Sequence, residues 1–374
     1  MITLVIVHWN TPKELKKQLS MLAGDSEFHI IVVDNHSDEP VSWIASEFPK
    51  VQLIQNKVNR GYAFACNQGI RASKGEWIFF LNPDVYITHD AVNDVISYAK
   101  EHNLDAVSPT PTTSPAPQNN DYQKPLPTPI SLLAEFTPLH HIIPASFILD
   151  LTDRTTLFGG CIGIRRWIIE DLGGWDERYF VWFEDADLTK QLYDKGYKIG
   201  WAPVPFEHEG GSSFDLLSTK LKRDVFFNEM KVYADKHFGF LGKTIIRFIC
   251  WRFKVSKLLP QLHKGVSVTI PNMRKDLLDS FLHHNAHILN SITHPIVVTS
   301  GVKPKGIWIY REQHPDVRFI PISSNKGFAH TVNCGFRASP TKWVATINDD
   351  VEMSEKMPEN WLIICLVGAP VDAG

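Results

Sequence analysis

A stretch of 27 residues occurs twice in this chain, and this repeat constrains the fold more than any other feature. Residues 59–85 read NRGYAFACNQGIRASKGEWIFFLNPDV, and residues 325–351 read NKGFAHTVNCGFRASPTKWVATINDDV. The two copies align without a gap, and 12 of the 27 positions are identical. Each copy runs from a glycine turn through a helix-compatible segment to an acidic strand end. We therefore expect two modules built from the same supersecondary unit.

The residues before and within the first copy predict an α/β fold. Residues 2–7 and 29–33 are dominated by β-branched side chains, and TPKELKKQLSML between them has helical spacing with Pro12 in its first turn. WIFFL then follows a helix-compatible segment, which indicates a predominantly parallel sheet with flanking helices. The carboxyl ends of such strands form one crevice. HWN, DNHSD and NPD all fall at that edge.

The second module begins near residue 266, where VSVTIPNMRKDLLDSFL resembles the first strand and helix. Asp84 is followed by a long segment that leads to an acidic cluster at Asp185, whereas 24 residues follow Asp350. We expect an α/β domain at 1–240, a basic amphipathic linker or helix at 241–265, and an incomplete second module, with only the nucleotide-binding half of the first, at 266–374. Seven prolines between residues 109 and 129 predict an irregular insertion in the first domain.

Composition narrows the class of partner and compartment. The net charge of −3 and the pI near 6.6 provide no basic field, so we expect no nucleic-acid partner. Five cysteines without CxxC spacing favour a reducing cytoplasm over a disulfide framework. The apolar start reads as a strand and not as a signal segment, and no stretch approaches the roughly 20 apolar residues of a membrane span.

Polar residues at the strand ends are candidate ligand contacts. Asp84 in LNPDV is placed to bind a divalent cation that bridges phosphates, although an Asn-Pro-Asp turn explains it equally well. Asp34 and Asn35 can hydrogen-bond a base or ribose, or else cap the following segment. Thr299 replaces Asp34 in the second copy, so the nucleotide site of that copy is already suspect.

Asn59 and Gly61 open the repeated segment. Glycine allows the backbone to approach a ligand, and asparagine offers both a donor and an acceptor. Their recurrence as Asn325 and Gly327 equally fits a purely structural turn followed by close helix packing. Both explanations remain open for these positions.

The segment WFEDADLTKQLYDKGY carries the sharpest signal for catalysis. Favourable interactions with the helix N-terminus explain one or two of Glu184, Asp185 and Asp187. The preceding aromatic run YFVWF can shield a carboxylate from water and raise its basicity towards that of a general base. His208, after the strand-like KIGWAPVPF, is placed for a metal or phosphate contact.

In their order along the chain, the motifs VIVHWN, VVDNHS, NRGYAFACNQGI, FLNPDV, GGCIGIRR, GGWDERYFVWFEDADL and HEGGSS resemble family 2 glycosyltransferases of the GT-A fold, especially bacterial rhamnosyltransferase-like members. The resemblance covers about residues 1–240. It implies inverting transfer of a sugar from a nucleotide-diphosphate sugar, such as dTDP-rhamnose or a UDP-sugar. The acceptor would be a hydroxyl of a saccharide or polyprenyl-linked saccharide in cell-surface polysaccharide synthesis.

The resemblance also implies roles for individual residues. Asp185 would be the catalytic base, and Asp84 with His208 would hold Mg²⁺ or Mn²⁺. Asn82 stands where the metal motif of the family has its first acid, so Asp84 is the acid of that motif which this sequence keeps. The residues expected around the nucleotide sugar are His8, Asn10, Asp34, Asn35, Asn59, Gly61, Asn67 and Asn82.

Two other function classes stay open. A sugar-phosphate nucleotidyltransferase uses similar strand-end acids, but HWNTPKELKK is not the basic, glycine-rich phosphate loop expected of it. A catalytically silent nucleotide-sugar binding module fits residues 266–374; a longer gene would instead make this a tandem synthase. KTIIRFICWRFKVSKLLP is either an interfacial helix, giving peripheral membrane contact at the inner face of the cell membrane, or a core helix. The sequence does not indicate an oligomeric state.

Overall fold

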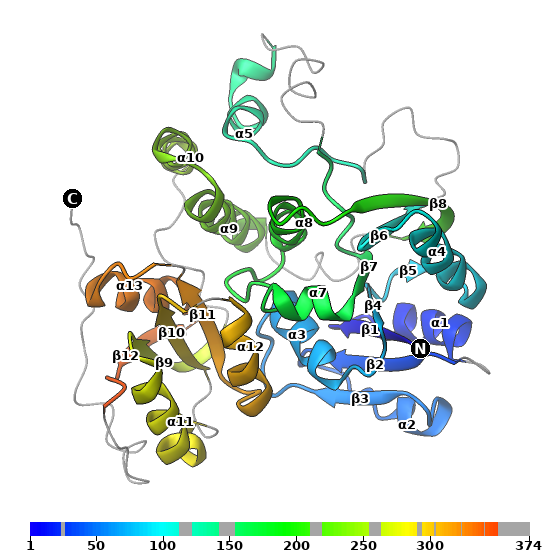
Figure 1. Cartoon of the computed structure of the whole chain (residues 1–374), viewed down its shortest axis with the longest axis horizontal. Helices are drawn as coiled ribbons and strands as arrows, with labels where there is room; N and C mark the ends of the chain where they lie inside the picture. The colour runs from blue at the N-terminus through cyan, green and yellow to red at the C-terminus, as the bar shows by residue number, and fades with distance from the viewer. Residues whose placement is uncertain are drawn as a thin grey trace. The chain divides into compact units, whose positions relative to one another are not determined.

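The chain forms two compact units, Met1–Lys257 and Leu258–Gly374. They are seen in a computed structural model (Figure 1) that describes residues 1–23, 27–111, 122–141, 154–209, 219–253, 263–289, 294–302, 304–322, 324–339 and 341–350. Each unit has its own sheet.

The first unit is built on an eight-stranded sheet of order β3-β2-β1-β4-β7-β6-β8-β5. The pairings of β1 with β2 and β4, of β2 with β3 and of β6 with β8 are parallel, whereas β7 runs antiparallel to β4 and β6. The predicted α/β architecture with a mostly parallel sheet is therefore confirmed. The strands are β1 (Ile2–His8), β2 (His29–Asp34), β3 (Gln52–Gln55), β4 (Trp77–Leu81), β5 (Val85–Tyr86), β6 (Ala106–Pro111), β7 (Cys161–Arg165) and β8 (Ile199–His208).

Helices cover this sheet because each presents an apolar stripe to it. Leu15, Leu19 and Leu22 recur at helical spacing on α1 and share a buried cluster with β1, β2, β4 and residues of α4. The helices are α1 (Pro12–Leu22), α2 (Trp43–Glu47), α3 (Tyr62–Ala72), α4 (His89–Glu101), α5 (Pro129–Glu135), the 3₁₀ turn η1 (Pro138–His141), α7 (Arg166–Asp171), α8 (Glu184–Asp194), α9 (Thr219–His237) and α10 (Phe240–Arg252).

The proline-rich stretch is more regular at its ends than the sequence predicted. Pro109 and Pro111 lie in β6, where the pairing with β8 shifts register between Pro109 and Thr110. Such an irregularity lets a strand tolerate proline. Pro129 occupies the first turn of α5, after a capping box made by Thr128. Residues 112–121 lie outside the described residues.

The second unit contains a four-stranded parallel sheet of order β11-β10-β9-β12. This order is that of β3-β2-β1-β4 in the first unit. Its elements are β9 (His263–Asn272), α11 (Lys275–Leu289), β10 (His294–Ser300), α12 (Pro304–Gln313), β11 (Arg318–Ile322), α13 (Phe328–Ala338) and β12 (Thr341–Thr346). Residues 351–374 lie outside the described residues.

The repeated glycines have the same packing role in both units. A Cβ added to Gly69 of α3 would lie 2.2 Å from Cγ1 of Val5 in β1, and one on Gly335 of α13 would lie 2.1 Å from Cγ2 of Thr269 in β9. Both helices therefore approach their central strand more closely than any side chain would allow. This packing accounts for the second glycine of the repeat without a ligand.

The turn before each helix is also the same. Gly61 and Gly327 have φ of 92° and 84°, a backbone conformation that favours glycine. In each turn the Oδ1 of the asparagine two residues earlier, Asn59 or Asn325, accepts the glycine N–H at 2.9 Å. The local sequence Asn-x-Gly thus builds the turn by itself in both modules.

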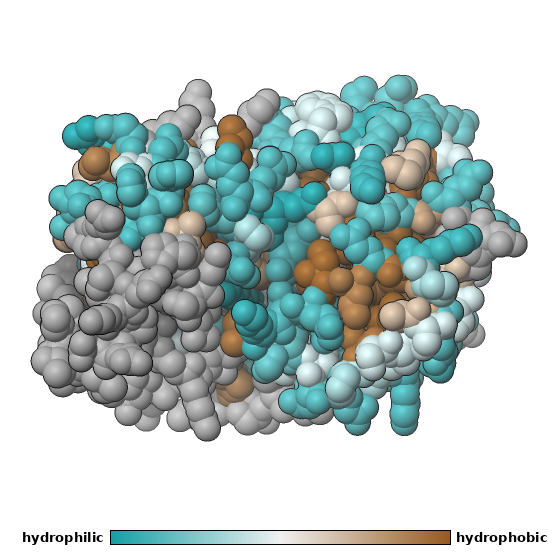
Figure 2. Space-filling model, turned by 90° about the horizontal axis from the view of Figure 1, so that it is seen from below, coloured by the Kyte–Doolittle hydropathy of each residue, from teal (hydrophilic) through white to brown (hydrophobic). Residues whose placement is uncertain are grey.

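The segment 241–265, expected as a linker or helix, contains most of α10 and the start of β9. Ile246, Ile249 and Cys250 of α10 are buried in a cluster with α9. Within the described part of the chain, no helix has the length and apolar character needed to cross a membrane. Figure 2 shows a face of the molecule on which hydrophilic residues predominate among those coloured, and the largest group of hydrophobic residues lies right of centre.

Candidate active site

The carboxyl ends of the parallel strands bring several predicted residues together. In the register of β1 and β2, His8 pairs with Asp34, and β4 pairs with β1 on the other side. Asn35 donates from Nδ2 to Asn59 Oδ1 at 2.8 Å and to the carbonyl oxygen of Gly61 at 3.1 Å. Asp34 Oδ1 accepts the N–H of Ser37 at 3.0 Å. Of the expected nucleotide residues, Asn35, Asn59 and Gly61 therefore form one hydrogen-bonded group, and their ligand role remains a prediction.

His8 and Asn10 lie at the end of β1 in different environments. His8 is fully buried, its Nδ1 lies 3.1 Å from Oγ1 of Thr11, and Nε2 has no hydrogen-bond partner among the described residues. Burial lowers the pKa of His8 to about 4 although the Asp34 carboxylate opposes this, so the imidazole is neutral at physiological pH. Asn10 is joined to Asp38 by two hydrogen bonds, of 3.0 and 2.7 Å.

Asn67 has the surroundings of a structural residue. Its side chain is completely buried in α3. Nδ2 donates to the carbonyl oxygen of Trp175 at 2.9 Å and to Oε1 of Glu177 at 2.7 Å, and Oδ1 accepts the N–H of Trp175 at 2.8 Å. The amide thus anchors residues 175–177, which the spacing of the sequence could not reveal because these partners lie more than 100 residues away.

The turn after β4 carries the candidate metal ligands. Val85 of β5 pairs with His208 of β8, which brings His208 Nε2 to 3.5 Å from Oδ2 of Asp84. Asn82 holds the turn through backbone contacts: its N–H donates to the carbonyl oxygen of Gly160 at 2.9 Å, and its own carbonyl oxygen accepts from Val85 at 3.1 Å. The structure therefore brings Asp84 and His208 together, as expected from the sequence.

One carboxylate and one imidazole suit a cation whose other ligands come from a substrate. No group of three or more His, Cys, Asp or Glu side chains within the described ranges could hold a metal ion. Mg²⁺ commonly takes one or two protein carboxylates and completes its shell with water and phosphates. Asp84 with His208 fits such a site, whereas a site made by protein ligands alone does not fit.

Sequence reasoning missed Tyr122 as a part of this corner. Its hydroxyl oxygen lies 3.2 Å from Nδ1 of His208, on the opposite side of the ring from the nitrogen that faces Asp84. Its ring also contacts those of Phe158 and Phe206, with centroids 5.0 and 6.1 Å away. Tyr122 orients His208, but it follows a proline-rich stretch in which no local pattern marks it.

Asp185 lies in the first turn of α8 in a partly buried position. Oδ1 of Asp185 accepts the N–H of Ala186 at 2.7 Å. If Gly159 carried a Cβ, that atom would lie 2.9 Å from the Cβ of Asp185. Burial raises the pKa of the Asp185 carboxyl, while the backbone N–H groups of Ala186 and Gly159 and the charge of Lys124 partly oppose this. A raised pKa suits a carboxylate that accepts a proton during a reaction.

Residues 158–160 connect the Asp84 turn to Asp185. The Phe158 ring lies 5.2 Å from that of His208, and Gly160 accepts the N–H of Asn82. Gly159 lies against Asp185, so that a side chain at that position would press on the carboxylate. Two acids that are remote in sequence therefore border the same three-residue segment.

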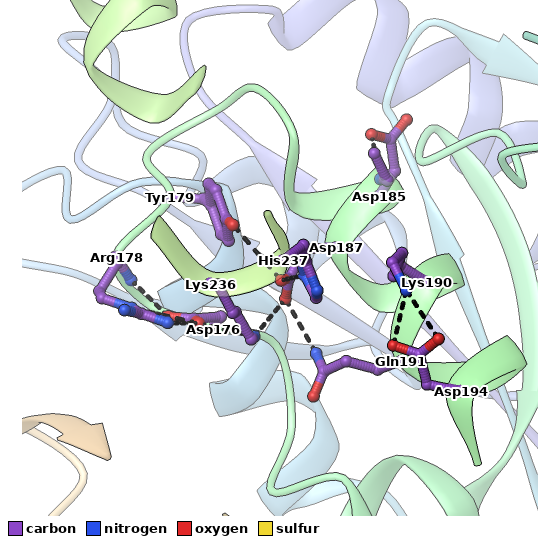
Figure 3. A network of polar contacts seen from close by, with 11 residues as sticks. Asp176, Arg178, Tyr179, Asp185, Asp187, Lys190, Gln191, Asp194, Lys236 and His237 are labelled. Carbon is purple, nitrogen blue, oxygen red and sulfur yellow. Dashed lines mark hydrogen bonds and ion pairs between the residues drawn. The ribbon is translucent and has the colours of Figure 1, made fainter. Parts of the chain in front are cut away.

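Asp187, two residues after Asp185, points away from it into a buried polar network (Figure 3). It accepts from Lys236 Nζ at 2.7 Å, His237 Nε2 at 2.6 Å and Gln191 Nε2 at 2.8 Å. Lys236 also contacts Asp176 at 2.9 Å. Asp187 therefore ties α8 to α9 and is a structural residue.

Glu184 and Glu229 complete the acidic surroundings. The Glu229 carboxylate accepts backbone N–H groups of residues 180–182, at 2.7 Å from Trp182, and so holds the aromatic run in place. Glu184 is buried, and burial together with the charges of Asp185 and Glu229 raises its pKa well above the usual range. Glu184 therefore binds its proton more tightly in the folded protein than an exposed glutamate does.

Comparison with known proteins identifies the family. Residues 3–173 match the family described as Glycosyl transferase family 2. The matched part of the first unit belongs to this family. The family predicted from the sequence is confirmed for this glycosyltransferase domain by that match, and the predicted α/β class with a mostly parallel sheet is confirmed by the strand order.

Several curated proteins are similar to the glycosyltransferase domain. The low-salt glycan biosynthesis hexosyltransferase Agl10 of Haloferax volcanii is 24% identical over 208 residues, which cover 54% of this chain and 65% of that protein. The N-acetylglucosaminyl-diphospho-decaprenol L-rhamnosyltransferase of Mycobacterium tuberculosis is 28% identical over 54% of the chain and 72% of that protein. Rhamnosyltransferase WbbL of Escherichia coli is 25% identical over 57% and 86%. The chain thus spans slightly less than two thirds of the Haloferax relative.

Solved structures resemble the chain more distantly. The mannosyltransferase PcManGT of Pyrobaculum calidifontis, in complex with GDP-Man and Mn²⁺, has a TM-score of 0.45 and 14% identity over 84% of each chain. Residues 1–349 of TarS from S. aureus, in complex with UDP-GlcNAc, have a TM-score of 0.42 and 16% identity over 68% of this chain and 73% of that chain.

Proposed function

We propose that the first unit is an inverting glycosyltransferase, which moves a sugar from a nucleotide-diphosphate sugar to a hydroxyl of a saccharide acceptor. One observation carries the proposal: the turn that holds Asp84, its neighbour His208, and Asp185 all border residues 158–160, which lie within the family 2 match. A diphosphate would lie at the first pair and the acceptor hydroxyl at Asp185.

Asp185 would act as the base. Its carboxylate takes the proton from the acceptor hydroxyl while that oxygen attacks the anomeric carbon and the bond from this carbon to the diphosphate breaks. The attack comes from the face opposite the leaving group, so a single displacement inverts the anomeric configuration. The N–H of Ala186 fixes one carboxylate oxygen at 2.7 Å, which directs the other towards the acceptor.

Asp84 and His208 would hold Mg²⁺ or Mn²⁺ together with the diphosphate. Bound there, the cation supplies positive charge that stabilises the departing diphosphate. Tyr122 keeps the His208 ring in its orientation. Gln18 stabilises the turn that carries Asp84, because its Nε2 donates to the carbonyl oxygens of Asn82 and Val85 at 2.9 and 2.6 Å. Because Asn82 replaces an acid, metal affinity depends on the phosphates of the donor.

The donor and acceptor classes are proposed from the relatives. Two of them are named rhamnosyltransferases, one of which is named for a diphospho-decaprenol acceptor. We therefore propose dTDP-rhamnose or a UDP-sugar as donor, and a lipid-linked saccharide in glycan synthesis as acceptor. Asp34, Asn35, Asn59 and Gly61 would line the nucleoside end at the carboxyl ends of the strands.

The second unit is proposed to be catalytically silent. It keeps the strand order and the Asn-x-Gly turn, and Asp350 stands at the place of Asp84. Asp350 is exposed and Thr299 replaces Asp34, so the unit lacks the acid that we assign to the nucleoside. The packing roles of its glycines explain the repeat without a second active site.

Asp185→Asn tests the proposed reaction. The variant should lower sugar transfer by about 10²- to 10⁴-fold, the usual contribution of a general base. Binding of the donor, measured by calorimetry with dTDP-rhamnose or UDP-sugars and Mn²⁺, should be retained. Asp194→Asn on the same helix, where Asp194 is paired with Lys190, is the matched control. Retained transfer in Asp185→Asn would remove Asp185 from the base role.

A further inference from the structure

Helix α10 has an apolar face that nothing in the described part of the first unit covers. Ten large hydrophobic side chains are exposed in the described residues, and four of them lie on this one helix. These four define the α10 apolar face: Phe240 (79% exposed), Leu241 (76%), Phe248 (49%) and Trp251 (74%). Single exposed hydrophobic residues are ordinary, whereas such a concentration marks an interaction site.

The helix is two-sided. At 3.6 residues per turn, the four side chains of the α10 apolar face fall on one side together with Thr244. The opposite side carries Gly242, Ile246, Ile249 and Cys250, which are buried against the rest of the unit. The helix is already anchored by its other face, so its apolar face is not left over from incomplete packing.

Cations border the apolar face on both sides. Lys243 and Arg247 lie along one margin of the helix and Arg252 along the other, and residues 240–252 contain no Asp or Glu. The nearest acid pairing is Arg247 with Asp235 of α9 at 4.0 Å, where both side chains are largely exposed. An exposed ion pair of this kind is weak, so the Arg247 guanidinium stays available to anionic groups.

We propose that α10 is a membrane-surface helix, which lies in the interface of a bilayer containing anionic lipid. An interfacial helix inserts an aromatic and aliphatic face while lysine and arginine along its margins contact anionic headgroups. Tryptophan favours this depth because its ring is apolar and its N–H is polar. With 13 residues the helix is too short to span a bilayer, so it lies along the surface.

The neighbouring helix α5 packs against the buried side of α10. Pro129 of α5 packs against Gly242 of α10, because a Cβ added to Gly242 would lie 2.8 Å from Cγ of Pro129. The next residue, Ile130, is 40% exposed. α9, on which α10 packs, also carries Lys236 and His237, which hold α8 beside Asp185. If the proposed function is correct, a lipid-linked acceptor would therefore reach the base from the membrane on which α10 rests.

Vesicle sedimentation with the full chain tests this surface without reference to transfer activity. We expect the protein to sediment with vesicles of phosphatidylcholine and phosphatidylglycerol and much less with phosphatidylcholine alone. The double variant Phe248→Ser with Trp251→Ser should lower the partition coefficient about tenfold or more, because two inserted rings are lost. Lys243→Gln with Arg252→Gln should lower it about tenfold on the anionic vesicles only.

Trp167→Ser is the matched control, because Trp167 is a 55% exposed tryptophan on α7, away from the α10 apolar face. It should bind vesicles like the wild type, and unchanged melting temperatures would show that the variants fold. Wild-type protein that stays in solution with anionic vesicles would overturn the proposal. So would lipid-free self-association that the Phe248→Ser/Trp251→Ser variant loses, because the face would then bind a second copy of the chain.

Discussion

At the scale of single residues, the two copies of the repeat provide their own control. Asp84 is buried beside His208, whereas Asp350 at the equivalent place is exposed. We expect Asp84→Asn to lower sugar transfer at least about a hundredfold, because the cation that would hold the diphosphate loses its carboxylate ligand. Asp350→Asn should leave transfer unchanged. Steady-state rates at varied Mn²⁺ concentration measure this, and an equal loss in both variants would assign a reaction to the second unit.

Glu184 makes a residue-scale prediction about pH and stability. A carboxyl whose folded pKa is raised binds its proton more tightly in the folded protein, so stability falls as pH rises from the unfolded value of about 4.3. Glu184→Gln removes this loss. The variant should therefore melt higher than the wild type at pH 7, by about 2 °C or more, and show little difference near pH 4. An equal difference at both pH values would contradict the protonation of Glu184.

At the scale of elements, the approach of α3 to β1 decides where the Asn-x-Gly turn and Tyr62 are held. Gly69→Ala places a methyl group against Val5, and we expect it to destabilise the first unit by about 1–3 kcal/mol. Gly239→Ala is the control, because Gly239 has a φ of −70° and an added Cβ would meet no atom within 4 Å. Urea unfolding followed by circular dichroism compares them. A neutral Gly69→Ala would show that the helix can move away from the strand without cost.

At the scale of the whole molecule, two compact units predict two unfolding transitions. A donor that binds only the folded first unit should raise one of them, by about 2.7 kcal/mol in free energy at 100 times its Kd. Gly69→Ala should lower that same transition, and Gly335→Ala should lower the other. Scanning calorimetry with UDP-, dTDP- and GDP-sugars plus Mn²⁺ measures both. A donor that shifts the transition sensitive to Gly335→Ala would mean that the second unit binds nucleotide.

Local features of this protein were readable from the sequence because they depend on residues close together in the chain. Alternation of β-branched strands with amphipathic helices predicts the parallel sheet, and Asn-x-Gly predicts its turn twice, at Gly61 and Gly327. The order of the polar strand ends predicts that Asn10, Asp34 and Asp84 belong to one edge. These conclusions follow from φ preferences and periodicity alone.

The partners of each polar side chain were decided only by the tertiary structure. Asn67 looks like a ligand candidate in the sequence, yet its side-chain amide is hydrogen-bonded to remote partners, Trp175 and Glu177. Tyr122 carries no sequence signal and still reaches His208. The sequence determined the repeated framework; burial and contacts between distant segments decided which polar groups stay available for chemistry, because only packing determines what each side chain meets.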